Sequence, residues 1–141
     1  MTRYAFPLAL ALIPITLVCL LSLPLILLGF IKPDPHPWNW LSIYMVDFLF
    51  GLLLLAHIVG FLRRCAWSRL LTAALGGYAA LAFGQTALEM LLDIAGIQAA
   101  PVTNRGFILA FMLYGFTVAA AMLFFAFRFP EYWFRFGRSD V

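Results

Sequence analysis

Polar side chains recur at four-residue intervals along one apolar stretch of the chain, in the order Gln85, Glu89 and Asp93. On an α-helix this spacing places all three on one face, and Tyr78 and Ala82 extend the same stripe. A carboxyl group in apolar surroundings can hold a proton, bind a cation or a cationic ligand, or act as a general acid or base. The stripe is therefore the first candidate for a functional site.

A second apolar stretch carries Asp47 near one end and His57 near the other. With a rise of about 1.5 Å per residue, the two would stand about 15 Å apart along a helix, which is too far for direct pairing. We interpret His57 as hydrogen-bonded to a neighbouring backbone or hydroxyl group, with membership of a proton relay as the alternative. His36 lies outside the apolar stretches, so a haem held by two histidines of this chain is excluded.

The chain shows no motif for a metal or a cofactor, and we predict neither. Asp34 and His36 alternate with prolines in a stretch that reads as a stiff, solvated connection, and two ligands are too few for a metal site. Cys19 and Cys65 are expected at different membrane depths and so should not pair. Without a nucleophile elbow, a zinc-binding histidine pair or a phosphate loop, an enzyme is disfavoured but stays open.

The composition indicates an integral membrane protein. Of 141 residues, 65% are hydrophobic and only 11% are charged, far from the values of soluble domains. Four segments reach the roughly 20 apolar residues that a membrane-spanning helix needs: residues 4–31, 41–62, 70–97 and 107–127. We therefore predict an all-α fold, a bundle of four transmembrane helices forming one domain over residues 1–141.

The distribution of cations predicts the orientation of this bundle. Most cations fall on one side of a four-span chain, namely Arg3, Arg63, Arg64, Arg69, Arg128, Arg135 and Arg138, while Lys32 and Arg105 fall on the other. By the positive-inside rule both termini and the middle connection are cytoplasmic. The net charge of +3 thus comes from loop arginines and does not indicate nucleic-acid binding. A composition rich in arginine, alanine and leucine favours a bacterial inner (plasma) membrane.

In this topology the acidic residues gather near the outer surface. Asp93, Asp47 and Glu89 would lie about 6, 9 and 12 Å below the outer helix ends. The short connection between the second and third spans makes these helices antiparallel neighbours, so the three carboxyl groups should share one layer. Lys32 and Arg105 at the rim can reach inward. The layer is then either an ion-pair cluster that fixes packing or a binding site.

Two further segments predict contacts between helices or with the membrane. Small residues recur four apart in residues 73–84, which lets helices approach closely; we place this third span at the centre of the bundle, with a homo-oligomer face as the alternative. Residues 129–136 combine aromatic and basic side chains and should form a C-terminal segment in the inner interface, with a partner-docking tail as the alternative.

Together these features predict a small, non-enzymatic accessory or scaffold subunit with an outer-side polar pocket between the second and third spans. Its partners would be membrane lipid, a membrane protein or a second copy, and no nucleic acid. One alternative is a carrier or binding protein for a proton, a cation, a cationic small molecule or a lipid. The other is a membrane enzyme that uses Asp47 and Glu89 as acid and base on a lipid or isoprenoid.

Overall fold

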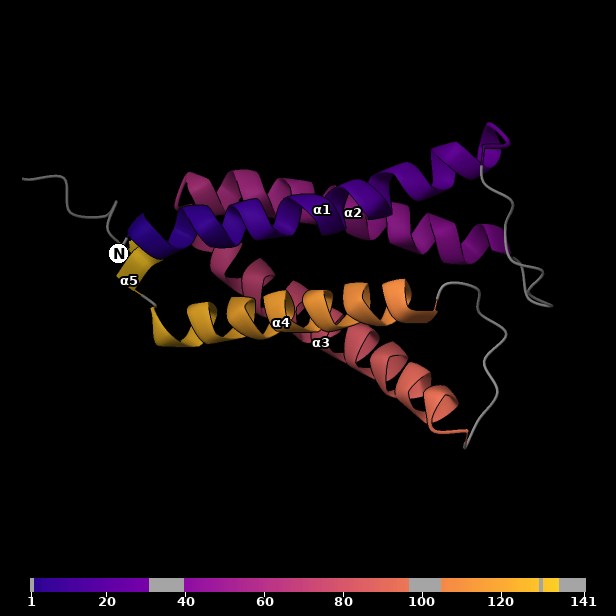
Figure 1. The fold of residues 1–141 in the computed structure, drawn as a ribbon. Helices are drawn as coiled ribbons and strands as arrows, with labels where there is room; N and C mark the ends of the chain where they lie inside the picture. Colours follow the sequence, from indigo (N-terminus) through magenta and orange to yellow (C-terminus); the bar gives the residue numbers. More distant parts are fainter. Residues whose placement is uncertain (1, 31–39, 97–104, 130, 135–141) are drawn as a thin grey trace, which may run out of the picture. The chain divides into compact units, whose positions relative to one another are not determined.

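The computed structural model describes residues 2–30, 40–96, 105–129 and 131–134, and every regular element in this part of the chain is helical. The long helices are α1 (Thr2–Leu27), α2 (Trp40–Leu62), α3 (Ala66–Ile94) and α4 (Arg105–Arg128), followed by the short α5 (Glu131–Phe134) (Figure 1). The predicted all-α class is confirmed for these residues.

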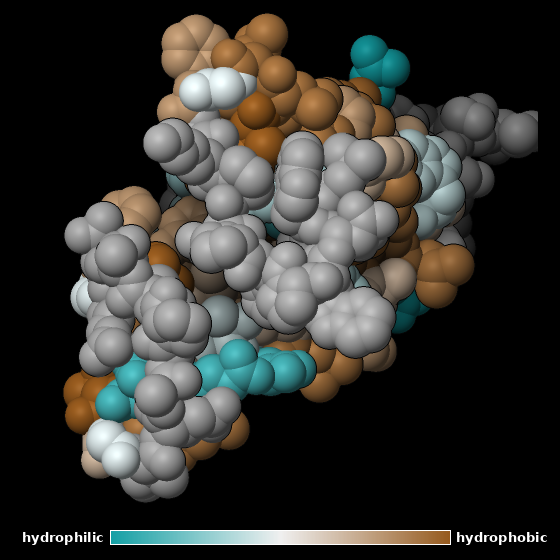
Figure 2. All heavy atoms as spheres, turned by 90° about the vertical axis from the view of Figure 1, so that its right-hand side faces the viewer, coloured by the Kyte–Doolittle hydropathy of each residue, from teal (hydrophilic) through white to brown (hydrophobic). Residues whose placement is uncertain are grey.

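Three helices are long and apolar enough to cross a membrane, over Ala5–Leu27, Tyr44–Leu62 and Gly106–Arg128. Many of their large apolar side chains are exposed, and hydrophobic residues make up most of the coloured surface in Figure 2. These helices indicate a membrane protein. The longest described helix, α3, is not among the three, because its glycines add no hydropathy and Gln85, Glu89 and Asp93 subtract from it.

The chain divides into two compact units, Met1–Cys65 and Ala66–Val141. The first is the α1–α2 hairpin and the second is the α3–α4 hairpin with α5. The single domain over residues 1–141 stays a prediction.

The α1–α2 hairpin packs along a seam with a seven-residue repeat. On α1 the repeat is Ala5, Leu12, Cys19 and Ile26, all buried except the half-buried Cys19; on α2 it is the half-buried Asp47 and the buried Leu54 and Phe61. Such spacing keeps one face of each helix turned toward its neighbour. A Cβ added at Gly51 would lie 3.0 Å from the Cys19 Cβ, so the two backbones approach closely there.

Three helices end in the same turn, which places a residue with positive φ just beyond the helix. These residues are Gly29 (φ 78°), Arg64 (φ 57°) and Gly96 (φ 72°). After α1, for example, Gly29 N–H donates to the Ile26 carbonyl and Phe30 N–H to the Leu25 carbonyl, the Schellman pattern. As a result α1 ends before the predicted residue 31. The connection between α2 and α3 shortens to residues 63–65, because 66–69 join α3.

Glycines bring α3 and α4 together as antiparallel neighbours. A Cβ at Gly76 would lie 3.1 Å from the Met122 Cβ, and one at Gly84 would lie 3.2 Å from the Phe116 ring. Small residues of α3 therefore do allow close helix approach, and the helix they meet is α4. The other side of the small-residue segment is open, since a Cβ at Gly77 would meet nothing within 4 Å among the described atoms.

The segment after α4 folds back onto its own hairpin. Tyr132 and Trp133 are buried and both contact the Phe125 ring edge-on. The indole Nε1 of Trp133 donates a hydrogen bond of 2.8 Å to the Ser68 hydroxyl of α3. These two aromatic side chains are thus packed against their own hairpin. The placement of residues 129–136 in the inner interface, or as a docking tail, stays a prediction.

The glycine contacts predict a sharp difference between two alanine substitutions. In Gly115→Ala the new Cβ would lie 2.7 Å from the Phe83 ring, so the ring must move and the free energy of unfolding should fall by about 1–3 kcal/mol. Gly77→Ala has room for its Cβ and should gain up to about 1 kcal/mol from helix propensity. Unfolding of both variants in mixed micelles measures the difference. Equal stabilities would contradict the described α3–α4 packing.

Candidate functional site

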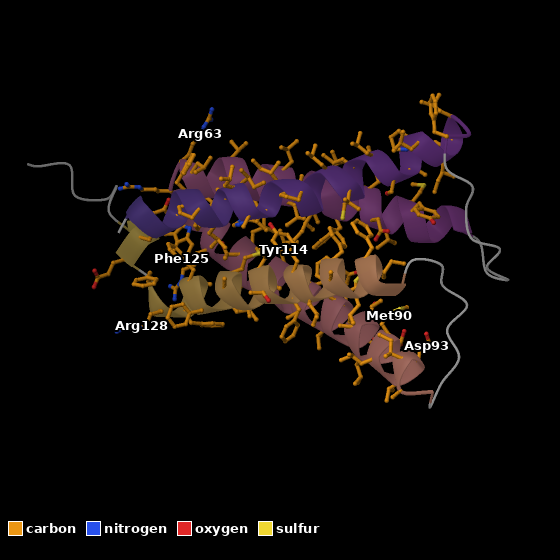
Figure 3. The ribbon with its side chains drawn as sticks, viewed as in Figure 1. Arg63, Met90, Asp93, Tyr114, Phe125 and Arg128 are labelled. Carbon is orange, nitrogen blue, oxygen red and sulfur yellow. The ribbon has the colours of Figure 1, made fainter. Side chains whose placement is uncertain are left out.

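The predicted polar stripe of α3 is partly buried and partly exposed. Asp93, at the end of the helix, is buried with 7% of its surface exposed, and Glu89 is half-buried. Gln85, Ala82 and Tyr78 are exposed. Figure 3 shows Asp93 beside Met90 on the last turns of α3. The stripe therefore does not form one buried site, and its members lie in different surroundings.

Gln85 and Glu89 form a hydrogen-bonded pair. The amide Nε2 of Gln85 donates to Oε1 of Glu89 over 2.9 Å. Within the described ranges the Glu89 side chain makes this one hydrogen bond. The bond uses only one of its two carboxyl oxygens. The neighbouring Leu81 and Leu88 expose 77% and 57% of their surfaces, so the polar pair lies in an apolar, outward-facing surface.

Asp93 lies at the level where α4 begins. The contacts between Gly84 and Phe116 and between Gly115 and Phe83 set the antiparallel register. Following this register to the end of α3 brings the position of Asp93 opposite the first turn of α4, which starts at Arg105. The role of Arg105 as a rim cation stays a prediction, because its side chain lies outside the described set. Lys32, the other predicted rim cation, also lies outside it.

Asp47 lies in the α1–α2 seam, near Cys19. Asp47 stands one helical turn from Gly51, where an added Cβ would contact Cys19, and the Ser22 hydroxyl donates 3.0 Å to the Cys19 carbonyl. Cys19 and Cys65 are not joined by a disulfide. Asp47 belongs to one hairpin, and Glu89 and Asp93 belong to the other. Their shared outer layer and the pocket between the second and third spans stay predictions.

His57 is fully buried in the same seam, at 0% exposure. Its ring lies 5.4 Å from the Phe61 ring, and neither ring nitrogen has a hydrogen-bond partner among the residues described. Because Gly51 faces Cys19 and Leu20, the register puts His57 opposite residues 12–16 of α1. The Thr16 hydroxyl in that turn donates instead to the Leu12 carbonyl. The expected hydrogen bond of His57 to a backbone or hydroxyl group is thus not found in this part of the chain.

The structure also reveals polar contacts that the sequence did not indicate. Ser68 accepts from Trp133 and is buried, and the Thr72 hydroxyl donates 2.6 Å to the Ser68 carbonyl. The Nε of Arg69 donates 3.2 Å to the Ala126 carbonyl of α4. In a continued helix that carbonyl would accept from residue 130, which is a proline without an amide hydrogen. The sequence shows the proline and the hydroxyl residues. It does not show their partners, which lie at distant sequence positions.

No three His, Cys, Asp or Glu side chains come together to hold a metal ion in the described ranges. Comparison of the chain with protein families, curated proteins and solved structures gives no match. Function is therefore argued from the residues themselves.

Replacing His57 distinguishes packing from hydrogen bonding. An apolar side chain of similar size removes two buried nitrogen atoms that lack partners, so His57→Leu should leave the free energy of unfolding unchanged or raise it by about 1 kcal/mol. Reversible unfolding in mixed micelles is the measurement. Leu54→Ala in the same seam, expected to lose about 2 kcal/mol or more, shows that the assay detects a packing defect. A loss above about 2 kcal/mol in His57→Leu would show that the imidazole has a partner.

Proposed function

We propose that this chain is a small, non-enzymatic accessory or scaffold subunit of a membrane assembly, built from four spanning helices. The observation that carries the proposal is the exposed Gln85–Glu89 pair on α3. A carboxyl group facing hydrocarbon costs about 2.5–3.5 kcal/mol on insertion scales, so covering it with another protein is favourable.

The packing of α3 on α4 supports a fourth span. Contacts between the two helices occur near the start of α3, where Arg69 bonds to Ala126, and continue through Gly76 to Gly84. A helix that lies along a spanning helix over this length passes through the same slab of membrane. With 29 residues α3 is about 43 Å long, enough to cross.

The polar groups at the other end of this hairpin favour a structural role there. Ser68, Trp133 and Arg69 form hydrogen bonds within the hairpin. Such internal bonding stabilises the fold. Among the described residues at this end, no pair of groups is placed for acid–base catalysis. We place this arginine-rich end and both termini in the cytoplasm of a bacterium, with the protein in the inner membrane.

The second candidate function is a carrier or binding protein. It is favoured by the carboxyl oxygen of Glu89 that Gln85 does not use, which can take a proton, a cation, a cationic small molecule or a lipid headgroup. An enzyme acting on a lipid or isoprenoid would need Asp47 and Glu89 together, and we rank it third.

Reporter fusions test the four-span topology. Alkaline phosphatase, which is active only outside the cytoplasm, should be active when fused after Pro35 or Thr103 and inactive after Cys65 or Val141. Fusions to a fluorescent protein that folds only in the cytoplasm should give the reverse pattern. Equal phosphatase activity after Cys65 and after Thr103 would mean that α3 does not cross the membrane.

Site-specific photocross-linking in cells tests the scaffold proposal. A photoreactive residue at the exposed Leu81 or Leu88 should give a cross-linked protein product of defined mass, while one at Met90, buried against the hairpin, should not. Only lipid adducts at Leu81 and Leu88 would contradict the proposal. The binding alternative gains support if a lipid, an amine or a pH step shifts the melting temperature of the wild type but not of Glu89→Gln.

A further inference from the structure

Within the α3–α4 hairpin, one side of α3 combines a polar pair with room for a neighbouring helix. Its residues follow helical three- and four-residue spacing: Ala74, Gly77, Leu81, Gln85 and Leu88. All are exposed except the half-buried Gly77, where a Cβ would meet nothing within 4 Å. We call this set the open face of α3. Small residues in its first half permit close approach of another helix, and Gln85 holds Glu89 at its second half.

We propose that the open face binds a transmembrane helix of another protein that carries an arginine or lysine at the depth of Glu89. This inference rests on the proposed scaffold function and adds the chemistry of the partner. The argument is charge complementarity along an otherwise apolar surface.

The described cations of the α3–α4 hairpin lie too far away to neutralise Glu89. Arg69 precedes Glu89 by 20 residues, which is about 30 Å along the helix axis. Arg128 lies at that same end, and Figure 3 shows it far from Asp93. Arg105 begins α4 at the level of Asp93, one turn beyond Glu89, so Asp93 is the nearer carboxyl group by register. Gln85 is neutral, so the described residues of this hairpin place no cation beside Glu89.

The other occupants fit less well. A second copy placed symmetrically on this face would bring a second Glu89 toward the first, and like charges repel. A free metal ion would need further ligands, and the described residues provide no group of three. A basic residue on a partner helix supplies both the charge and the hydrogen-bond donors.

Model transmembrane helices test this inference with the full chain. The chain is labelled at Cys65 in a Cys19→Ala background and reconstituted in phosphatidylcholine vesicles with acceptor-labelled leucine/alanine peptides. One peptide carries a single arginine at the depth of Glu89, and its matched control carries leucine there. Energy transfer should show the arginine peptide binding about tenfold more tightly to the wild type. Glu89→Gln should reduce this preference to less than twofold, whereas Asp93→Asn should keep it.

The outcomes separate the inference from the proposed function. Binding of both peptides with equal affinity, or a preference that survives Glu89→Gln, overturns the inference and leaves the scaffold function standing. If neither peptide binds, the inference fails, and if photocross-linking at Leu81 and Leu88 also gives only lipid adducts, the scaffold function fails with it. Self-association of the chain that Glu89→Gln abolishes would identify a second copy as the occupant and overturn the inference. Circular dichroism confirms that Glu89→Gln retains the helical content of the wild type.

Discussion

The close approach of α3 and α4 is the constraint on which the second hairpin depends. Glycine at positions 76, 84 and 115 permits it, because a Cβ at each would press on the facing helix. This contact fixes which side of α3 is buried, and so it also fixes that Gln85 faces outward while Asp93 is covered. It also brings Ser68 and Arg69 to the end of α4, where Trp133 and the Ala126 carbonyl bond to them. The proposal of a fourth span rests on the same contact, since α3 runs beside a helix that is itself long and apolar enough to cross.

The two hairpins differ in the burial and hydrogen bonding of their polar groups. In the α1–α2 seam, His57 is enclosed without a hydrogen-bond partner in the described part of the chain. A polar group enclosed in this way lowers the stability of the fold, because nothing replaces its hydrogen bonds to water. In the α3–α4 hairpin, the buried polar groups at the arginine-rich end bond to one another, and the pair that is left over faces outward. An outward polar pair on a membrane helix is the feature expected of a subunit that is completed by a neighbour.

The α5 segment carries aromatic residues that serve the packing of its own hairpin. Tyr, Trp and Phe beside arginine predict an interfacial anchor on composition alone. In the structure, Tyr132 and Trp133 also cover the Phe125 ring. The indole then finds a buried hydroxyl, which compensates the cost of burying its N–H.

The sequence by itself determined the properties that depend on composition and local spacing. Hydropathy predicts a helical membrane protein, because the backbone in lipid must satisfy its own hydrogen bonds, and the four-residue spacing of Gln85 and Glu89 predicts that they can pair. The tertiary structure decided which face of each helix is covered. Gly76 and Gly77 are neighbours of the same type, yet one packs against Met122 and the other faces open space, because the rotation of α3 on α4 is fixed by contacts between residues distant in sequence. The burial of Asp93 and His57 and the inward packing of Trp133 depend on such contacts too, and local spacing carries no information about them.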